Sequence, residues 1–159
     1  MDTLQSLIAN HPFAKGLEPR LLRVLAESAM EKEFAAGEVI FREGDGANRF
    51  YLILSGSVAI EVPTREKGNL QIQRIGAGEV LGWSWLFPPH YWNFNARAVE
   101  PTRAIFFYGT RLRGRCDEDA DLGYELMKRF TQVMVERLQF TRSRLFERKA
   151  VQCIPGAER

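Results

Sequence analysis

Short apolar segments separated by glycine-containing turns run from residue 34 to residue 108, and this pattern constrains the fold more than any other feature of the chain. The segments are rich in β-branched and aromatic residues, as strands are. Strands this short and this evenly spaced are typical of a sandwich, jelly roll or small barrel, and not of strand–helix–strand units. The predicted strands are 39–41, 50–54, 58–60 and 104–107, and the predicted turns lie at 44–46, 55–57, 67–69 and 76–78.

Helical patterns flank this β region on both sides. Pro19 suits a first helical turn, and Leu21, Leu22 and Leu25 follow it at helical spacing. The 159 residues are enough for one domain with an appended helix, so we expect a mainly β chain of the α+β class. The expected divisions are an N-terminal helical segment at 1–32, a β-roll at 33–116, a long C-terminal helix at 117–149 and a tail at 150–159.

The long helix carries a coiled-coil-like apolar seam. At 1.5 Å per residue, roughly thirty residues span about 45 Å, which is longer than a small β domain needs for cover. Two interpretations follow: the helix folds back on its own sandwich, or it forms a homodimer with a second copy, which we prefer. The seam residues are Met127, Phe130, Met134, Leu138 and Leu145, and Arg137, Thr141 and Arg144 interrupt them.

Composition and charge exclude several classes of protein. No apolar run is long enough for a membrane-spanning helix, so we expect no membrane contact. Cys116 and Cys153 form no disulfide framework and no secretory signal is visible, which favours a cytoplasmic location. The formal net charge is only +2, and the basic excess in 111–149, 10 basic against 7 acidic residues, is typical of a solvated face. We therefore expect no DNA contact.

The sequence also lacks the residues of common enzyme sites. A metal-dependent jelly-roll enzyme needs three or four converging His and carboxylate ligands, and the chain has two histidines, His11 and His90. Neither cysteine lies in a recognisable nucleophile motif. The glycines at 76–82 depart from the dinucleotide-binding spacing and lack its strand–helix context. We predict no catalytic residues, no metal ligands and a non-enzymatic role.

The order helix, glycine-punctuated β-roll, long helix resembles the cyclic-nucleotide-binding domain. The motifs that carry the resemblance are Phe34–Asp45, with Gly37, Glu43 and Gly44, and Tyr51–Val58, with Gly56. The family includes the catabolite-activator (Crp/Fnr-like) effector domains, kinase regulatory subunits and gated channels. The resemblance extends from about His11 to the end of the long helix, and it implies a double-stranded β-helix (jelly roll) with a regulatory, signalling function.

The resemblance also implies a phosphate-binding cassette. The family binds its cyclic phosphate in a segment similar to Gly78-Glu79-Val80-Leu81-Gly82, which leads into a short helix. Backbone N–H groups at a helix start suit an anion. By resemblance, Glu79 accepts hydrogen bonds from a ribose hydroxyl, and an arginine at the far end of the cassette pairs with the phosphate.

The cassette departs from the family at that arginine. From Ile75 to Ala96 the chain has no Lys or Arg, and Trp92 falls at the arginine position when residues 95–99 are placed on the closing strand. Pro88-Pro89-His90-Tyr91 is the expected insertion. Removing one partner of a buried charge pair typically costs about 3–5 kcal/mol. That corresponds to roughly a hundredfold to a few thousandfold in affinity, so we expect weak cAMP binding by the family's usual mode.

Aromatic residues crowd the cassette instead, and three interpretations stay open. The rings fill the pocket as an apolar plug, or they line a pocket for another small planar ligand, or a cyclic nucleotide binds in an altered pose with its base stacked on tryptophan. Ser84, Asn93 and Asn95 are the polar groups that could orient a ligand. The candidate ligand-binding residues are Gly78, Glu79, Val80, Leu81, Gly82, Trp83, Ser84, Trp92 and Asn93.

The end of the chain shapes the last expectation. Residue 159 lies about ten residues after the long helix, so we expect no DNA-reading module and a stand-alone sensory module that acts on a partner protein. The alternative from another class is a structural interaction protein with a plugged pocket. Fold analogy alone does not decide between them.

Overall fold

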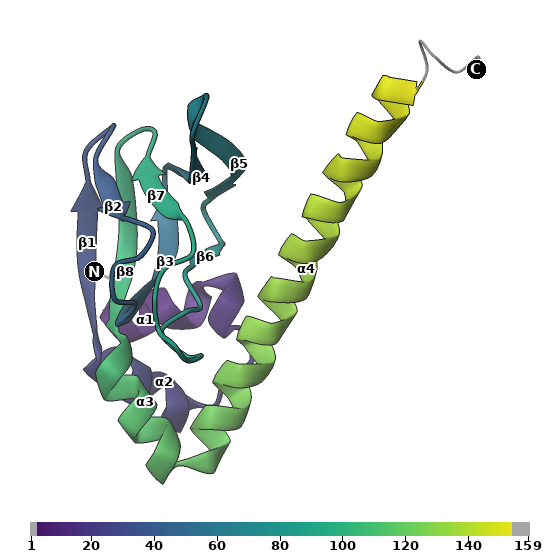
Figure 1. Ribbon diagram of the computed structural model, residues 1–159. Coiled ribbons are helices and arrows are strands. Elements are labelled where there is room, and N and C mark those ends of the chain that lie inside the picture. Colours follow the sequence, from purple (N-terminus) through teal and green to yellow (C-terminus); the bar gives the residue numbers. More distant parts are fainter. Residues whose placement is uncertain (1–2, 154–159) are drawn as a thin grey trace. The chain divides into compact units, whose positions relative to one another are not determined.

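Eight strands form two four-stranded antiparallel sheets whose inner faces share one core (Figure 1). The computed structural model describes residues 3–153, with side chains up to residue 147. The strand order is β1-β8-β3-β6 in one sheet and β2-β7-β4-β5 in the other, which confirms the jelly roll. The strands are β1 (Ala29–Phe34), β2 (Val39–Phe41), β3 (Arg49–Ser55), β4 (Ser57–Thr64), β5 (Gly68–Gly76), β6 (Val80–Leu81), β7 (Asn95–Ala98) and β8 (Thr102–Tyr108).

Three short helices precede the roll: α1 (Leu4–Asn10), the 3₁₀ helix η1 (Pro12–Ala14) and α2 (Pro19–Glu27). Pro19 occupies the first turn of α2, as its sequence position predicts. The helical segment ends at Glu27 rather than at residue 32, because the charged stretch 29–34 forms β1. β1 pairs with β8 from Ala29, opposite Phe107, to Phe34, opposite Thr102. This pairing outweighs the low strand propensity of the charged stretch.

Alternation along the strands builds two cores. Tyr51 and Ile53 of β3 face the inside of the roll, where they pack with residues of both sheets. Phe50 faces the other way and stacks on Phe107 at 4.4 Å and on Trp85 at 5.0 Å between ring centroids. The second cluster also includes Phe13 of η1, whose ring centroid lies 6.2 Å from that of Phe50. The N-terminal helices therefore cover the outer face of the β3 sheet.

The helical C-terminal part is two helices, α3 (Gly109–Glu118) and α4 (Ala120–Cys153), where the sequence predicted one from residue 117. Asp119 causes the break, because its backbone is extended and its Oδ1 accepts a hydrogen bond from the N–H of Leu122 at 3.3 Å. That contact caps the first turn of α4. The expected tail at 150–159 starts inside α4, and residues 154–159 lie outside the described residues.

The basic run 111–115 belongs to α3 and is used within the fold. Arg111 donates to the carbonyl oxygen of Glu27, and Arg115 forms an ion pair of 3.1 Å with the Glu27 carboxylate. Arg113 donates to the carbonyl oxygen of Trp85 in the cassette loop. These contacts fix α3 to α2 and to the cassette, which gives the run a structural role.

The described chain divides into two compact units between Glu125 and Leu126. The second unit is the main length of α4, a helix of 34 residues that is about 51 Å long. Large apolar side chains are exposed along it, including Leu138 (68%) and Leu145 (60%). Among the described residues, no helix combines the length and apolar character needed to cross a bilayer.

Candidate functional site

The cassette begins as a short edge strand against β3. Leu81 of β6 pairs with Tyr51, and Val80 pairs with Leu52. The Ile53 N–H donates to the carbonyl oxygen of Glu79 at 2.9 Å. The Gly78 N–H donates to the carbonyl oxygen of Ile53 at 3.0 Å. The expected cassette residues 78–82 are therefore contiguous with the roll, and both side chains of β6 are buried.

His11 holds the N-terminal segment against this start. Its Nε2 lies 3.0 Å from the carbonyl oxygen of Ile53, and its Nδ1 accepts the Phe13 N–H at 3.1 Å. The side chain of Pro12 lies 3.4 Å from the point where a Cβ on Gly78 would stand. Burial lowers the pKa of His11, because the charged ring would lose water. The sequence offered only an isolated histidine here, so this contact was not predicted.

Glu79 faces solvent rather than an interior pocket. Its Oε2 accepts the N–H of Gly76 at 2.8 Å, so the carboxylate closes its own turn. After Gly82 the chain makes a single turn, with the Leu86 N–H on the carbonyl oxygen of Trp83 at 3.0 Å, in place of the short helix that the resemblance implies. The Glu79 carboxylate, predicted to bind a ribose hydroxyl, thus bonds to the backbone of its own turn here.

Trp92 fills the inside of the roll beside the cassette. Its side chain is 1% exposed, and its indole stacks on Phe41 with ring centroids 3.7 Å apart and planes 8° apart. A Cβ on Gly82 would stand 2.8 Å from the indole, so only glycine allows this approach. Phe94 is buried in the same cluster and packs edge-on against the partly buried Trp83 at 6.0 Å.

The structure separates the aromatic residues that the sequence grouped. Trp85 is fully buried in the outer cluster with Phe50, so it does not line the candidate site. Asn93 and Tyr91 are exposed, because residues 91–94 alternate between solvent and interior. Asn95 is committed to the fold, since its Oδ1 accepts the Glu43 N–H at 2.7 Å.

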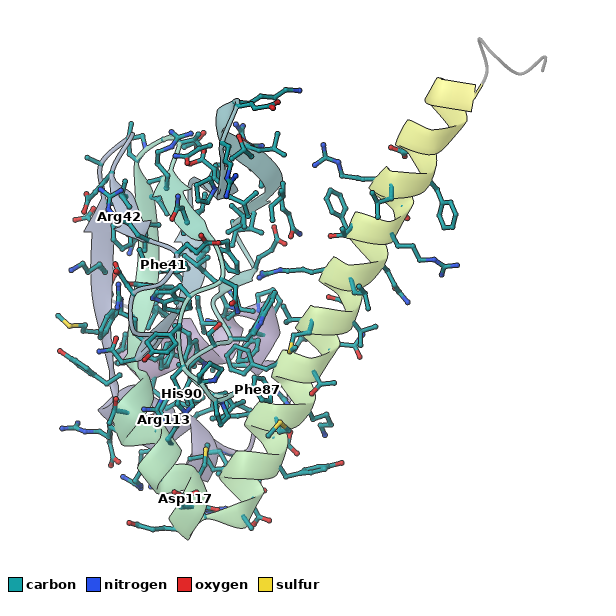
Figure 2. All side chains as sticks on the ribbon, in the orientation of Figure 1. Phe41, Arg42, Phe87, His90, Arg113 and Asp117 are labelled. Atoms are coloured by element: carbon teal, nitrogen blue, oxygen red, sulfur yellow. The ribbon has the colours of Figure 1, made fainter. Side chains whose placement is uncertain are left out.

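The loop before Trp92 has its own internal support. His90 adopts a positive φ of 62°, and its Nδ1 lies 3.1 Å from the carbonyl oxygen of the buried Ser84. Figure 2 places His90 and Phe87 at the end of the roll where α3 starts, close to Arg113 in this view. The His90 ring thus ties this loop to Ser84, and Arg113 of α3 binds the carbonyl oxygen of the next residue, Trp85.

Sequence reasoning missed Arg49 and Tyr51. Both lie on the interior-facing side of β3, and the Arg49 Nε donates to the Tyr51 Oη at 2.7 Å. Burial raises the pKa of Tyr51, which keeps the phenol protonated. The guanidinium carbon of Arg49 lies 5.9 Å from the Trp92 ring centroid. The available signal was the alternation of side chains at positions 49, 51 and 53. Which of the two faces of the strand points to the interior depends on the strand register.

Metal-binding groups were searched for within the described residues. That part of the chain contains no group of three or more His, Cys, Asp and Glu side chains that could hold a metal ion.

Comparison with known proteins gives relatives of one kind. A family model described as cyclic nucleotide-binding domain matches residues 31–119. A CRP-like cAMP-activated global transcriptional regulator of Mycobacterium tuberculosis is 24% identical over 144 residues, covering 89% of this chain and 62% of that protein. The chain thus spans less than two thirds of the length of this curated relative.

Solved structures share the fold. A cyclic nucleotide-binding domain from Methylobacillus flagellatus matches with a TM-score of 0.80 at 19% identity, covering 91% of this chain and 83% of that one. The regulatory subunit of a cAMP-independent protein kinase A from Trypanosoma brucei matches with a TM-score of 0.69 at 22% identity, covering 90% of this chain and 50% of that one. With the family model covering more than half of the chain and the jelly roll described above, the protein belongs to the cyclic nucleotide-binding domain family.

Proposed function

We propose that this protein is a sensory module of the family whose own Trp92 occupies the interior beside the cassette, so that cAMP binds weakly by the family's usual mode. The stack of Trp92 on Phe41, with the indole against Gly82, is the observation that supports this function. The fold supplies a regulatory module, and the side chains of the site set what that module can sense.

Two physical terms lower the affinity for cAMP in this proposal. A ligand that enters the interior must displace an indole that is 1% exposed, which gives up its apolar burial and its stacking. The cassette also supplies no cation between residues 75 and 96. The missing charge alone corresponds to about 3–5 kcal/mol, or roughly a hundredfold to a few thousandfold in affinity.

In the proposed output, a change at the cassette is transmitted through its contacts with η1 and α3. The side chain of Pro12 in η1 lies close to Gly78, 3.4 Å from where a Cβ would stand, and the carbonyl oxygen of Trp85 accepts a hydrogen bond from Arg113 of α3. A change at the cassette therefore acts directly on η1 and α3. A ligand shifts such a two-state equilibrium only if it prefers one arrangement of these contacts.

The proposed assembly is a homodimer through α4, with a further protein as the recipient of the signal. Leu138 and Leu145 lie seven residues apart on one side of the helix and are exposed, as a coiled-coil seam requires. The relatives named above are regulators, and we extend a regulatory, non-enzymatic role in the cytoplasm to this chain as part of the proposal.

The test is calorimetric titration of cAMP into the wild-type protein and the Trp92→Arg variant. We expect no saturable binding by the wild type below millimolar cAMP, and at least tenfold tighter binding by the variant, because the substitution removes the indole and restores a cation. Tyr91→Arg is the matched control, since it adds the same charge at a neighbouring side chain that is 55% exposed.

A third variant separates the two terms. Trp92→Ala removes the ring without adding charge, so a gain limited to Trp92→Arg assigns the effect to the cation, and an equal gain in both assigns it to the displaced indole. Micromolar binding of cAMP by the wild type would contradict the proposal and favour a cyclic nucleotide in an altered pose. Equal affinities of Trp92→Arg and Tyr91→Arg would also contradict it.

A further inference from the structure

Arg49 carries a charge that the fold does not neutralise. Arg20, Arg97, Arg103 and Arg115 form ion pairs with carboxylates at 2.6–3.3 Å, whereas Arg49 forms none with residues 3–147. The acceptors of Arg49 are neutral: Tyr51 Oη at 2.7 Å, Asn48 Oδ1 at 3.0 Å and the carbonyl oxygen of Ile40 at 3.3 Å. A partly desolvated cation without a counter-charge is unfavourable, and an anion would relieve it.

The position of Arg49 is as informative as its charge. Strand alternation places it on the same side of β3 as Tyr51 and Ile53, which face the interior of the roll. It is partly buried, and it lies over the ring of Trp92. The cation thus stands beside the residue that replaces the cassette arginine, but it comes from a different strand.

The indole of Trp92, next to Arg49, adds a second donor. Trp92 Nε1–H is buried and has no hydrogen-bond partner. A buried donor without an acceptor is costly, and it calls for an acceptor from outside the protein or for a change of conformation. The charge of Glu38 acts on Tyr51, and the Oε1 of Glu38 accepts the Ala35 N–H at 2.9 Å. A guanidinium without a carboxylate partner and an indole N–H without an acceptor together favour a ligand rich in acceptors and negative charge.

We propose that Arg49 is the anion-pairing residue of this roll, and that the module senses a small phosphate-bearing molecule through Arg49 rather than through the cassette. The guanidinium offers planar, paired donors that match a phosphate. This inference rests on the proposed sensory function and names its ligand class. It predicts that phosphate recognition moves from the cassette to the start of β3.

Inorganic phosphate is the first probe, because it carries the anion alone. The melting temperature is measured by calorimetry at pH 7 in 0–10 mM sodium phosphate, with sodium chloride holding the ionic strength constant. A ligand of the native state raises stability in proportion to the logarithm of its concentration above Kd. We expect the melting temperature of the wild type to rise by about 2–4 °C at the highest concentration. For Arg49→Gln we expect a rise of less than about 0.5 °C, which lies within the scatter of replicate scans.

Two further variants make the result specific. Arg74→Gln removes an exposed arginine of β5 and is expected to respond like the wild type. Arg49→Lys keeps the charge but loses the planar fork, so it should retain part of the shift even if Arg49→Gln lowers the melting temperature by breaking the bond to Tyr51. The proposal is overturned if phosphate does not stabilise the wild type, or if Arg49→Gln and Arg74→Gln respond alike.

Organic phosphates then identify the ligand class. Ribose 5-phosphate and cAMP are titrated into the wild type and Arg49→Gln, and a tenfold or greater loss of affinity in the variant for either compound distinguishes a sugar phosphate from a cyclic nucleotide.

Failure of this inference and failure of the proposed function give different results. A phosphate response that depends on Arg49 stands whether or not Trp92→Arg gains affinity for cAMP, and a gain by Trp92→Arg stands whether or not phosphate acts through Arg49.

Discussion

Single side chains decide how the cassette is joined to the rest of the protein, and His11 is the clearest case. Both ring nitrogens have partners, one on the carbonyl oxygen of Ile53 and one on the N–H of Phe13. Accepting the Phe13 N–H requires an unprotonated Nδ1, so the arrangement needs a neutral ring. His11 thus links the N-terminal segment to the strand that carries the cassette, and it does so only in one protonation state.

Stability should therefore fall on acidification. Burial holds the folded-state pKa of His11 below its ordinary value of about 6.5, so the unfolded chain binds the proton more readily. The stabilisation is complete above about pH 6.5 and is lost as pH falls through the folded-state pKa, with a slope of up to about 1.4 kcal/mol per pH unit. Urea unfolding at pH 7.5, 6.5 and 5.5 should give a clearly smaller pH dependence for His11→Gln than for the wild type.

His90→Gln is the control for that experiment. His90 is only partly buried, and its ring contacts the carbonyl oxygen of Ser84 through Nδ1. We expect this variant to keep the pH dependence of the wild type. If His11→Gln retained the full wild-type slope, the acid sensitivity would belong to other groups.

Turns in this roll pack closely against neighbouring strands. Among the described glycines, Gly56 in the turn between β3 and β4 leaves the least space for a Cβ. Gly56 has a φ of +101°, and a Cβ there would stand 2.4 Å from Thr102 Oγ1 and 2.6 Å from the carbonyl oxygen of Pro101. The Ser57 N–H also bonds to Thr102 Oγ1 at 3.2 Å. The turn therefore packs against the start of β8 with no space for a side chain.

Gly56→Ala should be strongly destabilising. The left-handed backbone and the clash with the strand backbone together predict a loss of about 2–4 kcal/mol in the free energy of unfolding. Gly114→Ala is the matched control, because Gly114 lies in α3 with nothing within 4 Å of its Cβ position. There the substitution should stabilise by roughly 0.5–1 kcal/mol. Urea unfolding of both variants measures the contrast, and a neutral Gly56→Ala would contradict the packing argument.

At the scale of the whole molecule, the described chain consists of a unit that contains the roll and a unit made of α4. The exposed leucines of α4 leave apolar surface uncovered in water, which is unfavourable. A second copy of α4 is the partner that the spacing of Leu138 and Leu145 favours.

The double variant Leu138→Glu/Leu145→Glu should convert dimers to monomers. Four glutamates would face one another across a dimer seam, where charge is costly. Light scattering after size-exclusion chromatography measures the mass. Gln139→Glu adds a charge about 100° away around the helix and should leave the dimer intact. A dimer that persists in the double variant would place the interface elsewhere.

The sequence predicted the elements whose pattern is local. The segments 39–41, 50–54, 58–60 and 104–107 all lie in strands, because β-branched and aromatic residues mark a pleated, half-buried surface by themselves. Stretch 29–34 carried no such signal and became β1 only because β8 offers it hydrogen bonds. The helix break at Asp119 was missed since capping depends on where the chain turns, not on composition.

The sequence by itself indicated the family, which the family model confirms, and it predicted where the cassette lies, because glycines and short strands follow the chain in order. It also determined that no cation lies between Ile75 and Ala96. Only the tertiary structure decided that Trp92 points inward, that Trp85 belongs to another core, and that Arg49 stands beside the indole. Neighbouring strand residues face opposite sides of a sheet, so a shift of one residue exchanges interior for exterior, and that register is fixed by partners distant in sequence.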